Sequence, residues 1–147
     1  MEFKIVLPFK AYSINDYYYN NRKFGKRKEA KDWEYQVNWQ LKNYDFSEFR
    51  SKFDPKTQAF KVSITYYYDN FYNKSGTLNK KIYDLSNCEK PLLDLIFNPA
   101  NHGPAPYKSP NLNIDDSNII EMNVKKCRGQ DRVEVTITIL ELNANTD

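Results

Sequence analysis

The sequence predicts a single α+β domain that spans residues 1–147, in which a small mixed or antiparallel sheet carries helices on one face. Four stretches alternate between apolar and polar residues, which is typical of half-buried strands. Two stretches between them repeat apolar residues at helical spacing. A chain of 147 residues also has the length of one ordinary domain. The expected order of elements is therefore β-α-β-α-β-β.

The four expected strands show period-two alternation over residues 3–7, 60–68, 120–125 and 132–139. The last two are joined by a short polar connection that contains Gly129. A glycine suits the tight turn of a hairpin because it adopts backbone conformations that other residues avoid. We therefore expect the third and fourth strands to pair directly as an antiparallel hairpin.

The first expected helix runs from about residue 29 to residue 42. Within it Trp33, Val37 and Leu41 recur every four residues, which predicts a buried stripe. The stretch 98–113 holds four of the seven prolines, so we expect it to be a loop.

The second expected helix runs from about residue 87 to residue 97. The stretch SNCE predicts a capping box, in which the Ser86 side chain caps the first turn and Glu89 returns to the Ser86 amide. Pro91 has no N–H to donate, which is harmless only near the first turn. The helix is therefore expected to start no earlier than Ser86 or Asn87.

Composition argues against several classes of protein. His102 is the only histidine, which argues against a His-ligated zinc site and against Ser/His/Asp hydrolysis unless His102 alone serves. Cys88 and Cys127 form neither a CxxC pair nor a disulfide framework, so we expect two buried or half-buried thiols in a reducing compartment. The N-terminus is too short and too charged for a signal peptide, and no apolar run reaches membrane-spanning length. We expect a cytoplasmic protein with no membrane partner and no organic cofactor.

Basic residues gather in one segment of the chain. Residues 20–31 hold six lysines and arginines against one glutamate, a net charge of +5, so the rest of the chain carries −2 of the total +3. A basic segment on a slightly acidic body indicates a polyanionic partner. A solvated loop that leads into a helix is the alternative that charge alone leaves open.

Polar residues form a seam along the second expected helix. Asn87, Lys90 and Asp94 stand at i, i+3 and i+7, on the side away from its apolar stripe. Asp84 lies just before the helix, and the pair Asp115–Asp116 directly precedes the third strand. Carboxylates with one lysine suit Mg²⁺-dependent phosphodiester hydrolysis, because Mg²⁺ takes oxygen ligands and lysine stabilises charge on the phosphate. Ordinary surface charge explains the same residues as a turn acid, an exposed i,i+4 pair and a loop acid pair.

The order and spacing of these residues resemble the RusA family of Holliday junction resolvases. The stretch DLSNCEKPLLDLIF, followed by IDDSNIIEMNVKK and a last alternating strand, is similar to the family's pattern. That pattern is an Asp-x-Asp-Asn-x-x-Lys-x-x-x-Asp motif, an Asp-Asp pair and two strands. The N-terminal FKIVLPFKAYSIN looks like the family's opening strand, its proline and its asparagine. The resemblance covers most of the chain, and its central motif is specific while its flanks are much less so.

The resemblance implies a RusA-like fold and a homodimeric endodeoxyribonuclease of recombination and repair. Such an enzyme nicks four-way DNA junctions at two symmetric positions with Mg²⁺, and Mn²⁺ is the alternative metal. The expected location is the bacterial cytoplasm, for a host, phage or prophage protein. The implied catalytic residues are Asp84, Lys90 and Asp116. The implied metal ligands are Asp84, Asp116, Asp115 and Asp94, and the supporting residues are Ser86, Asn87 and Glu89.

Two departures from the family's pattern bear on activity. Ser86 stands where the family has its second Asp, and a hydroxyl in place of a carboxylate weakens a Mg²⁺ site. Glu89 or Asp94 could supply the missing charge. An active enzyme and a branched-DNA-binding protein of the same fold without cleavage therefore both stay open, and a non-catalytic interaction module is the third hypothesis. The proline-rich loop before Asp115 is longer than the family's and could alter the dimer contact or the junction fit.

In this context the basic segment is expected to bind DNA phosphates without reading the sequence. Tyr17, Tyr18, Tyr19 and Phe24 are candidates for stacking on bases at the open crossover, unless they pack at the sheet edge. The run Tyr66–Tyr68 is expected to belong to a strand instead. The expected DNA-binding residues are Asn15, Arg22, Lys23, Lys26, Arg27 and Lys28.

Overall fold

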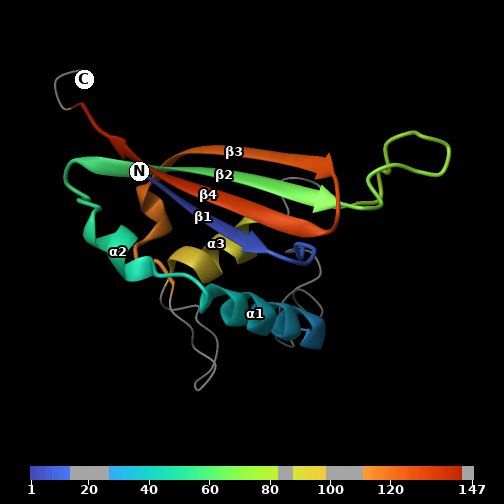
Figure 1. Ribbon diagram of the computed structural model, residues 1–147, viewed down its shortest axis with the longest axis horizontal. Coiled ribbons are helices and arrows are strands. Elements are labelled where there is room, and N and C mark those ends of the chain that lie inside the picture. Colours follow the sequence, from blue (N-terminus) through green and yellow to red (C-terminus); the bar gives the residue numbers. More distant parts are fainter. Residues whose placement is uncertain (14–26, 83–87, 99–110, 144–147) are drawn as a thin grey trace.

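The computed structural model describes residues 1–13, 27–82, 88–98 and 111–143, which form a four-stranded mixed sheet with three α-helices on one face (Figure 1). The α+β class is confirmed, and all four predicted strands are present. The elements in chain order are β1 (Glu2–Leu7), α1 (Lys28–Leu41), α2 (Phe46–Ser51), β2 (Gln58–Tyr68), α3 (Glu89–Phe97), the 3-10 helix η5 (Asp116–Asn118), β3 (Ile119–Arg128) and β4 (Arg132–Glu141).

The strands lie side by side in the order β1-β4-β2-β3. β4 pairs antiparallel with β1 on one side and with β2 on the other, whereas β3 pairs parallel with β2. The predicted hairpin of β3 and β4 is therefore wrong, because β2 lies between these two strands (Figure 1). The sheet is mixed for the same reason.

The connection from β3 to β4 passes the end of β2. Gly129 N donates a hydrogen bond to Tyr68 O at 3.1 Å, and Asp131 Oδ1 accepts one from Asp69 N at 3.0 Å. A Cβ atom on Gly129 would lie 2.8 Å from the Tyr67 ring, so a side chain there would force the ring to move. Gly129 thus permits the connection from β3 to β4 to pass close to the end of β2. In the sequence, such a connection has the same short polar, glycine-containing pattern as a hairpin turn.

The helix α1 confirms the predicted buried stripe, and α2 is an element that the sequence analysis missed. Trp33, Val37 and Leu41 of α1 are all buried. α2 has only six residues, which is too short for a repeating apolar pattern. Its N-terminus is capped by Asp45, whose Oδ1 accepts a hydrogen bond from Ser47 N at 3.1 Å.

The helix α3 begins later than predicted. Its N-cap is Cys88, which makes no side-chain cap hydrogen bond, so the predicted cap at Ser86 is wrong. Glu89 Oε2 does accept a hydrogen bond from Cys88 N at 3.2 Å, but from the first position of the helix and not the third. Pro91 lies in the first turn, as expected, because its missing N–H would have no partner within the helix there.

The core lies between the sheet and the helices, and an aromatic cluster ties three elements together. Phe60 of β2 stacks on Phe53 at 4.1 Å and on Phe49 of α2 at 6.2 Å between ring centroids. The ring of Phe97 in α3 meets Phe60 edge-on at 5.8 Å. The run Tyr66–Tyr68 belongs to β2, as predicted. The cluster fixes α2 and α3 on the same strand and so sets where the C-terminal end of α3 lies.

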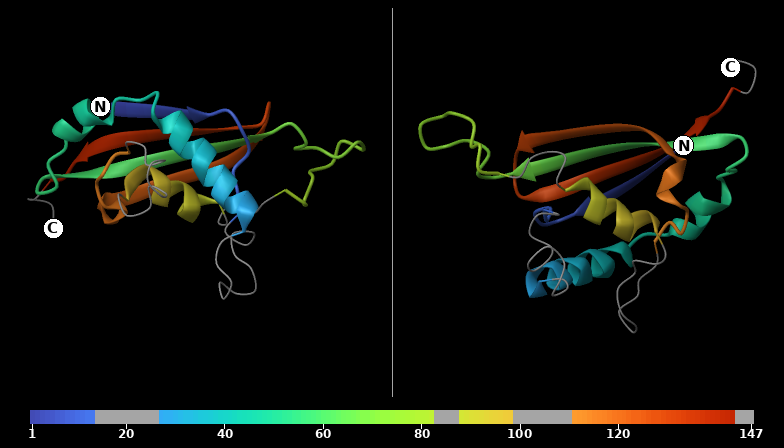
Figure 2. Two further views of the ribbon diagram at one scale, coloured as in Figure 1. Left: turned by 90° about the horizontal axis from the view of Figure 1, so that it is seen from below. Right: turned by 180° about the vertical axis from the view of Figure 1, so that it is seen from behind.

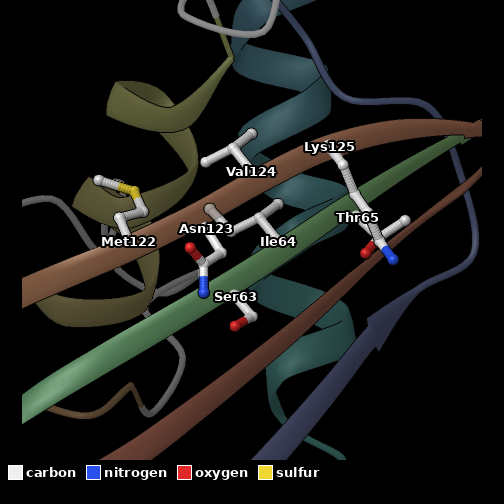
Figure 3. A pocket seen from close by; sticks show the side chains of 7 residues that line it. All are labelled: Ser63, Ile64, Thr65, Met122, Asn123, Val124 and Lys125. Atoms are coloured by element: carbon white, nitrogen blue, oxygen red, sulfur yellow. The ribbon is translucent and has the colours of Figure 1, made fainter.

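Among the described elements, none covers the opposite face of the sheet (Figure 2). Successive side chains of β2 and β3 point to opposite faces of the sheet. Figure 3 shows Met122 and Val124 directed toward the side of α3, whereas Ser63 and Asn123 are directed the other way. The helix side of β3 therefore brings apolar side chains next to α3, and its other side is polar.

Both cysteines are free thiols: Cys88 is buried and Cys127 is half-buried, as predicted. Within the described part of the chain, no helix has the length and apolarity that crossing a membrane requires.

Candidate active site

The polar side of α3 carries Lys90 and Asp94 one helical turn apart. Their side chains form an ion pair, with Lys90 Nζ 3.6 Å from Asp94 Oδ2. The Lys90 side chain is 69% exposed and the Asp94 side chain 24% exposed, so the ammonium reaches into solvent while the carboxylate is sheltered. An i,i+4 pair of this kind stabilises a helix by only about 0.2–0.5 kcal/mol. This ion pair therefore contributes little to stability, and the two groups are of interest for where they lie.

Asn98, which ends α3, joins Asp94 to Asp116. Its Nδ2 donates hydrogen bonds to Asp94 Oδ1 at 3.2 Å and to Asp116 Oδ2 at 3.4 Å. Two carboxylates from different elements thus converge on one amide nitrogen. Asn98 was not among the predicted site residues, although its spacing from Lys90 and Asp94 places all three residues on one side of a helix. That spacing is the signal that could have revealed it.

The segment before Asp116 docks on the C-terminal end of α3. Asn111 is buried, and its Nδ2 donates hydrogen bonds to Leu95 O at 3.0 Å and to Asn98 O at 3.2 Å. The last carbonyl groups of a helix have no partner within the helix, so a side chain that satisfies them is well placed to stabilise its end. This contact holds the start of the segment that leads to Asp116 against the same helix end that carries Asn98.

The helix α2 fixes the same segment from another side. Arg50 Nε donates a hydrogen bond to Leu112 O at 2.7 Å, and Arg50 Nη2 donates one to Asn111 O at 2.8 Å. Leu112 is buried, and its N–H bonds to Ile96 O at 2.8 Å. Asn113 has a positive φ of 57°, and its N–H bonds to Asn111 Oδ1 at 2.9 Å. Arg50 is thus a positioning residue, and no local sequence pattern links it to a segment 62 positions further along the chain.

The two acids before β3 have different surroundings. Asp115 is exposed and serves as the N-cap of η5, because its Oδ1 accepts a hydrogen bond from Ser117 N at 2.8 Å. Hydrogen bonds from Ser117 hold the pKa of the Asp115 carboxyl below its usual range. Asp116 is half-buried and faces Asn98 instead. Asp116 therefore belongs to the site on α3, whereas Asp115 Oδ1 is engaged in the local turn.

An open depression of about 550 Å³ lies between α3, η5 and β3. Burial raises the pKa of the Glu89 carboxyl above its usual range, against the lowering effect of backbone hydrogen bonds. The depression therefore combines an acid that holds its proton to higher pH with an exposed lysine and a second acid. Its lining residues are Glu89, Lys90, Leu93, Asp116, Met122 and Val124.

The buried side chain of Tyr66 lies close to the first turn of α3. Burial, and after it the nearby charge of Glu89, raises the pKa of Tyr66 far above its usual range. Among the described residues its hydroxyl group has no hydrogen-bond partner. Such groups are uncommon in folded proteins, because an unpaired buried hydroxyl costs free energy. The first turn of α3 thus lies beside a buried hydroxyl that has no described partner.

The structure brings together part of the predicted site. Lys90 pairs with Asp94, Asn98 links Asp94 to Asp116, and Glu89 lines the depression together with Lys90 and Asp116. Within the described ranges, no group of three or more His, Cys, Asp or Glu side chains could hold a metal ion. Arg27 and Lys28 lie at the N-terminus of α1. Other predicted residues lie outside the described residues: Asp84, Ser86, Asn87, His102, Asn15, Tyr17, Tyr18, Tyr19, Arg22, Lys23, Phe24 and Lys26.

No protein-family model matches the sequence, and no curated protein matches it. The geometry of these side chains and the motif that they form in the sequence are therefore the observations that bear on function.

Proposed function

We propose that this chain is a Mg²⁺-dependent endodeoxyribonuclease that resolves four-way DNA junctions in recombination and repair. The observation that supports the proposal most is the convergence of Asp94 and Asp116 on Asn98, next to the exposed ammonium group of Lys90. Surface charge alone does not require two acids from separate elements to share a donor, because like charges are more stable when they are apart.

The donor set around Asn98 fits a hard divalent cation. Mg²⁺ is usually held by one or two carboxylates together with water and substrate phosphate, and Asp94 and Asp116 offer such oxygens. A half-turn of the Asn98 amide would present its oxygen in place of its nitrogen. The motif adds Asp84 as a further ligand, and Mn²⁺ is the alternative metal. When bound, the metal would polarise the scissile phosphate and activate a water molecule.

The remaining residues of the site have roles that follow from their exposure. Lys90 is loosely paired and largely exposed, so its ammonium group can leave Asp94 and stabilise the negative charge that develops on a phosphate oxygen. Glu89 keeps its proton to higher pH than an ordinary glutamate and can serve in proton transfer closer to neutral pH. The depression is open, which suits a large substrate such as duplex arms of DNA.

A symmetric junction that is nicked at two matched positions calls for two matched sites, so the proposal includes a two-fold symmetric homodimer. The strand β3 supports this part, because it lies at the edge of the sheet and carries the exposed apolar side chains of Ile120 and Met122. Met122 also lines the depression next to Asp116. A second copy at this edge would therefore lie beside the site.

A binding protein of the same fold without cleavage is the second candidate. Two observations favour it: Ser86 replaces a motif carboxylate, and the described residues alone do not supply three acids at one point. Such a protein would bind branched DNA with the same surface and lack the metal affinity needed for hydrolysis.

The test is cleavage of a labelled four-way junction and of a linear duplex, each with and without Mg²⁺, by the wild-type protein and by Asp116→Asn. We expect paired nicks in the junction only with Mg²⁺ and only from the wild-type protein. Glu48→Gln removes a carboxylate from the exposed surface of α2 and serves as the matched control. Normal junction binding with no cleavage at any Mg²⁺ or Mn²⁺ concentration would favour the binding protein. Absence of junction binding would contradict both candidates and leave the interaction module.

A further inference from the structure

The helix α1 exposes two large aromatic side chains on its solvent side. Trp39 is 57% exposed and Tyr35 is 44% exposed, and their rings stack at 6.4 Å between centroids with an interplanar angle of 26°. Large aromatic groups contribute most to stability when they are buried, so a stacked pair left in solvent is not explained by folding. The buried Trp33 on the same helix shows that α1 already has an aromatic residue that serves the core.

The aromatic pair lies within a ridge of lysines. Lys28, Lys31, Tyr35, Trp39 and Lys42 follow one another in steps of three or four residues, which places them along one side of the helix. The ridge is opposite the stripe that faces the core, and at 1.5 Å per residue it is roughly 21 Å long. Lys42 Nζ lies 4.6 Å from the centroid of the Trp39 ring, so a cation adjoins the platform directly. Cations thus flank the two rings at both ends.

A shallow hollow of about 300 Å³ adjoins the rings. It is lined by Phe9, Tyr35, Gln36, Trp39 and Gln40. The side-chain amides of Gln36 and Gln40 each provide donors and an acceptor beside an apolar floor. This combination suits a flat heterocycle with polar edges better than it suits an aliphatic group.

We infer that the ridge of α1 binds unpaired nucleotides of single-stranded or branched DNA, with bases stacked on Trp39 and Tyr35 and phosphates near Lys31 and Lys42. Any base offers a face for stacking, so this platform tolerates sequence while the lysines follow the backbone. The ridge shares Lys28 and Lys31 with the basic segment that ends at Lys31. The inference extends the proposed function, because it identifies the part of a junction that α1 would hold.

The experiment is a titration of the full-length protein with an oligothymidylate of twenty nucleotides and, separately, with a four-way junction. Tryptophan fluorescence is the readout. The chain has two tryptophans, and Trp33 is only 6% exposed, so a base that stacks on Trp39 should quench the accessible part of the emission. Wild-type protein should be quenched by both ligands, and Trp39→Phe should lose the quenching. By fluorescence anisotropy of labelled oligothymidylate, Trp39→Ala and Tyr35→Ala should each weaken binding by roughly tenfold.

Tyr72→Ala provides the matched control. Tyr72 is 49% exposed, lies in the loop after β2, and has the guanidinium of Arg128 6.0 Å from its ring centroid, so it is also an exposed aromatic residue beside a cation. We expect this variant to bind oligothymidylate as the wild-type protein does. Equal affinity of Trp39→Ala and Tyr72→Ala would overturn the inference. It would also be overturned if sedimentation velocity showed that Trp39→Ala splits a dimer while oligothymidylate binding stays unchanged.

The outcomes separate this inference from the proposed function. Junction binding and cleavage without any response of Trp39 would reject the ridge and leave the enzyme intact. Binding of oligothymidylate through Trp39 without junction cleavage at any Mg²⁺ concentration would support the ridge and reject the enzyme. A wild-type protein that binds neither ligand would reject both.

Discussion

The helices α1 and α3 pack on the same face of the sheet, and they differ in what their polar sides meet (Figure 2). The polar side of α3 faces another element, because Asn98 at its end contacts Asp116 of η5. The outer side of α1 faces solvent and exposes Tyr35 and Trp39. Both helices have an apolar stripe, so the stripe alone does not indicate which helix carries chemistry.

The two surfaces are therefore suited to different tasks. Side chains that are held between two elements keep fixed relative positions, which hydrolysis of a phosphodiester requires. Side chains on a solvated ridge keep their rotamer freedom, which suits a flexible strand whose bases and phosphates vary in position. In the proposed function, α3 would therefore carry the chemistry and α1 would contact unpaired nucleotides.

The largest expected effect is one that the two helices share. Leu92 of α3 and Leu41 of α1 are fully buried, so Leu92→Ala and Leu41→Ala should each lower the free energy of unfolding by about 2–5 kcal/mol. Urea denaturation followed by circular dichroism measures this. Leu142→Ala, at an exposed position, should stay within about 0.5 kcal/mol of wild type. A loss at Leu41 as small as at Leu142 would mean that α1 is not packed on the sheet as described.

The next effect concerns the polar side of α3 alone. Lys90→Ala should lower the rate of junction cleavage by about 10²–10³-fold, because it removes the cation that would stabilise charge on the phosphate. The matched control is Lys52→Ala, since Lys52 is also exposed and forms an i,i+4 ion pair, with Glu48 at 3.4 Å. Single-turnover cleavage should be unchanged in this control. If both variants cleave at the same rate, the polar side of α3 is ordinary surface charge.

A smaller effect concerns what holds the two sides of the site together. Asn111→Ala removes the donor to Leu95 O and Asn98 O, so it should lower the free energy of unfolding by about 1–3 kcal/mol. Cleavage should fall as well, because Asp116 loses its fixed position relative to α3. Asn43→Ala, whose amide bonds only to half-buried Gln40 at 3.3 Å among the described residues, is the control for both measurements. Full activity of Asn111→Ala under conditions where it is folded would show that Asp116 does not need this anchor.

The strands and the buried side of α1 could be predicted from the sequence because they depend on local periodicity. The stripe of Trp33, Val37 and Leu41 needs only the repeat of a helix. The pairing of β3 could not be predicted in this way. Its parallel contact with β2 brings Phe60 opposite Ile119, and alternation does not reveal which strand is the neighbour. The turn signal at Gly129 was correct, and its interpretation as a hairpin was wrong.

The candidate site shows the same division. Lys90 and Asp94 could be placed together from their helical spacing, and Asp116 joined them through the resemblance to a known motif. The same helical spacing would also have placed Asn98 beside them. Arg50 could not be found from the sequence, because it acts through a backbone segment brought close by tertiary packing. Contacts between residues far apart in the sequence produce no periodic pattern in it.

The smallest expected effect compares the first turns of the two helices, each of which contains one glutamate. Glu29 of α1 is exposed, and Glu29→Gln should lower the free energy of unfolding at neutral pH by about 0.3–1 kcal/mol, because a negative charge near a helix N-terminus is favourable.

Glu89 of α3 is half-buried among Tyr66, Lys90 and Asp116, and burial raises its pKa in the folded protein above the value of 4.5 for an unperturbed glutamate. The folded state then binds more protons than the unfolded state between these two pKa values, so stability falls as pH rises through that window. Glu89→Gln removes this titration. Its stability relative to wild type should therefore increase from acidic to neutral pH and level off above the folded pKa. Urea denaturation of the wild-type protein and both variants, repeated from pH 4 to pH 8, gives the comparison directly. A constant difference between Glu89→Gln and wild type over this range would show that the pKa of Glu89 is the same in the folded and the unfolded protein.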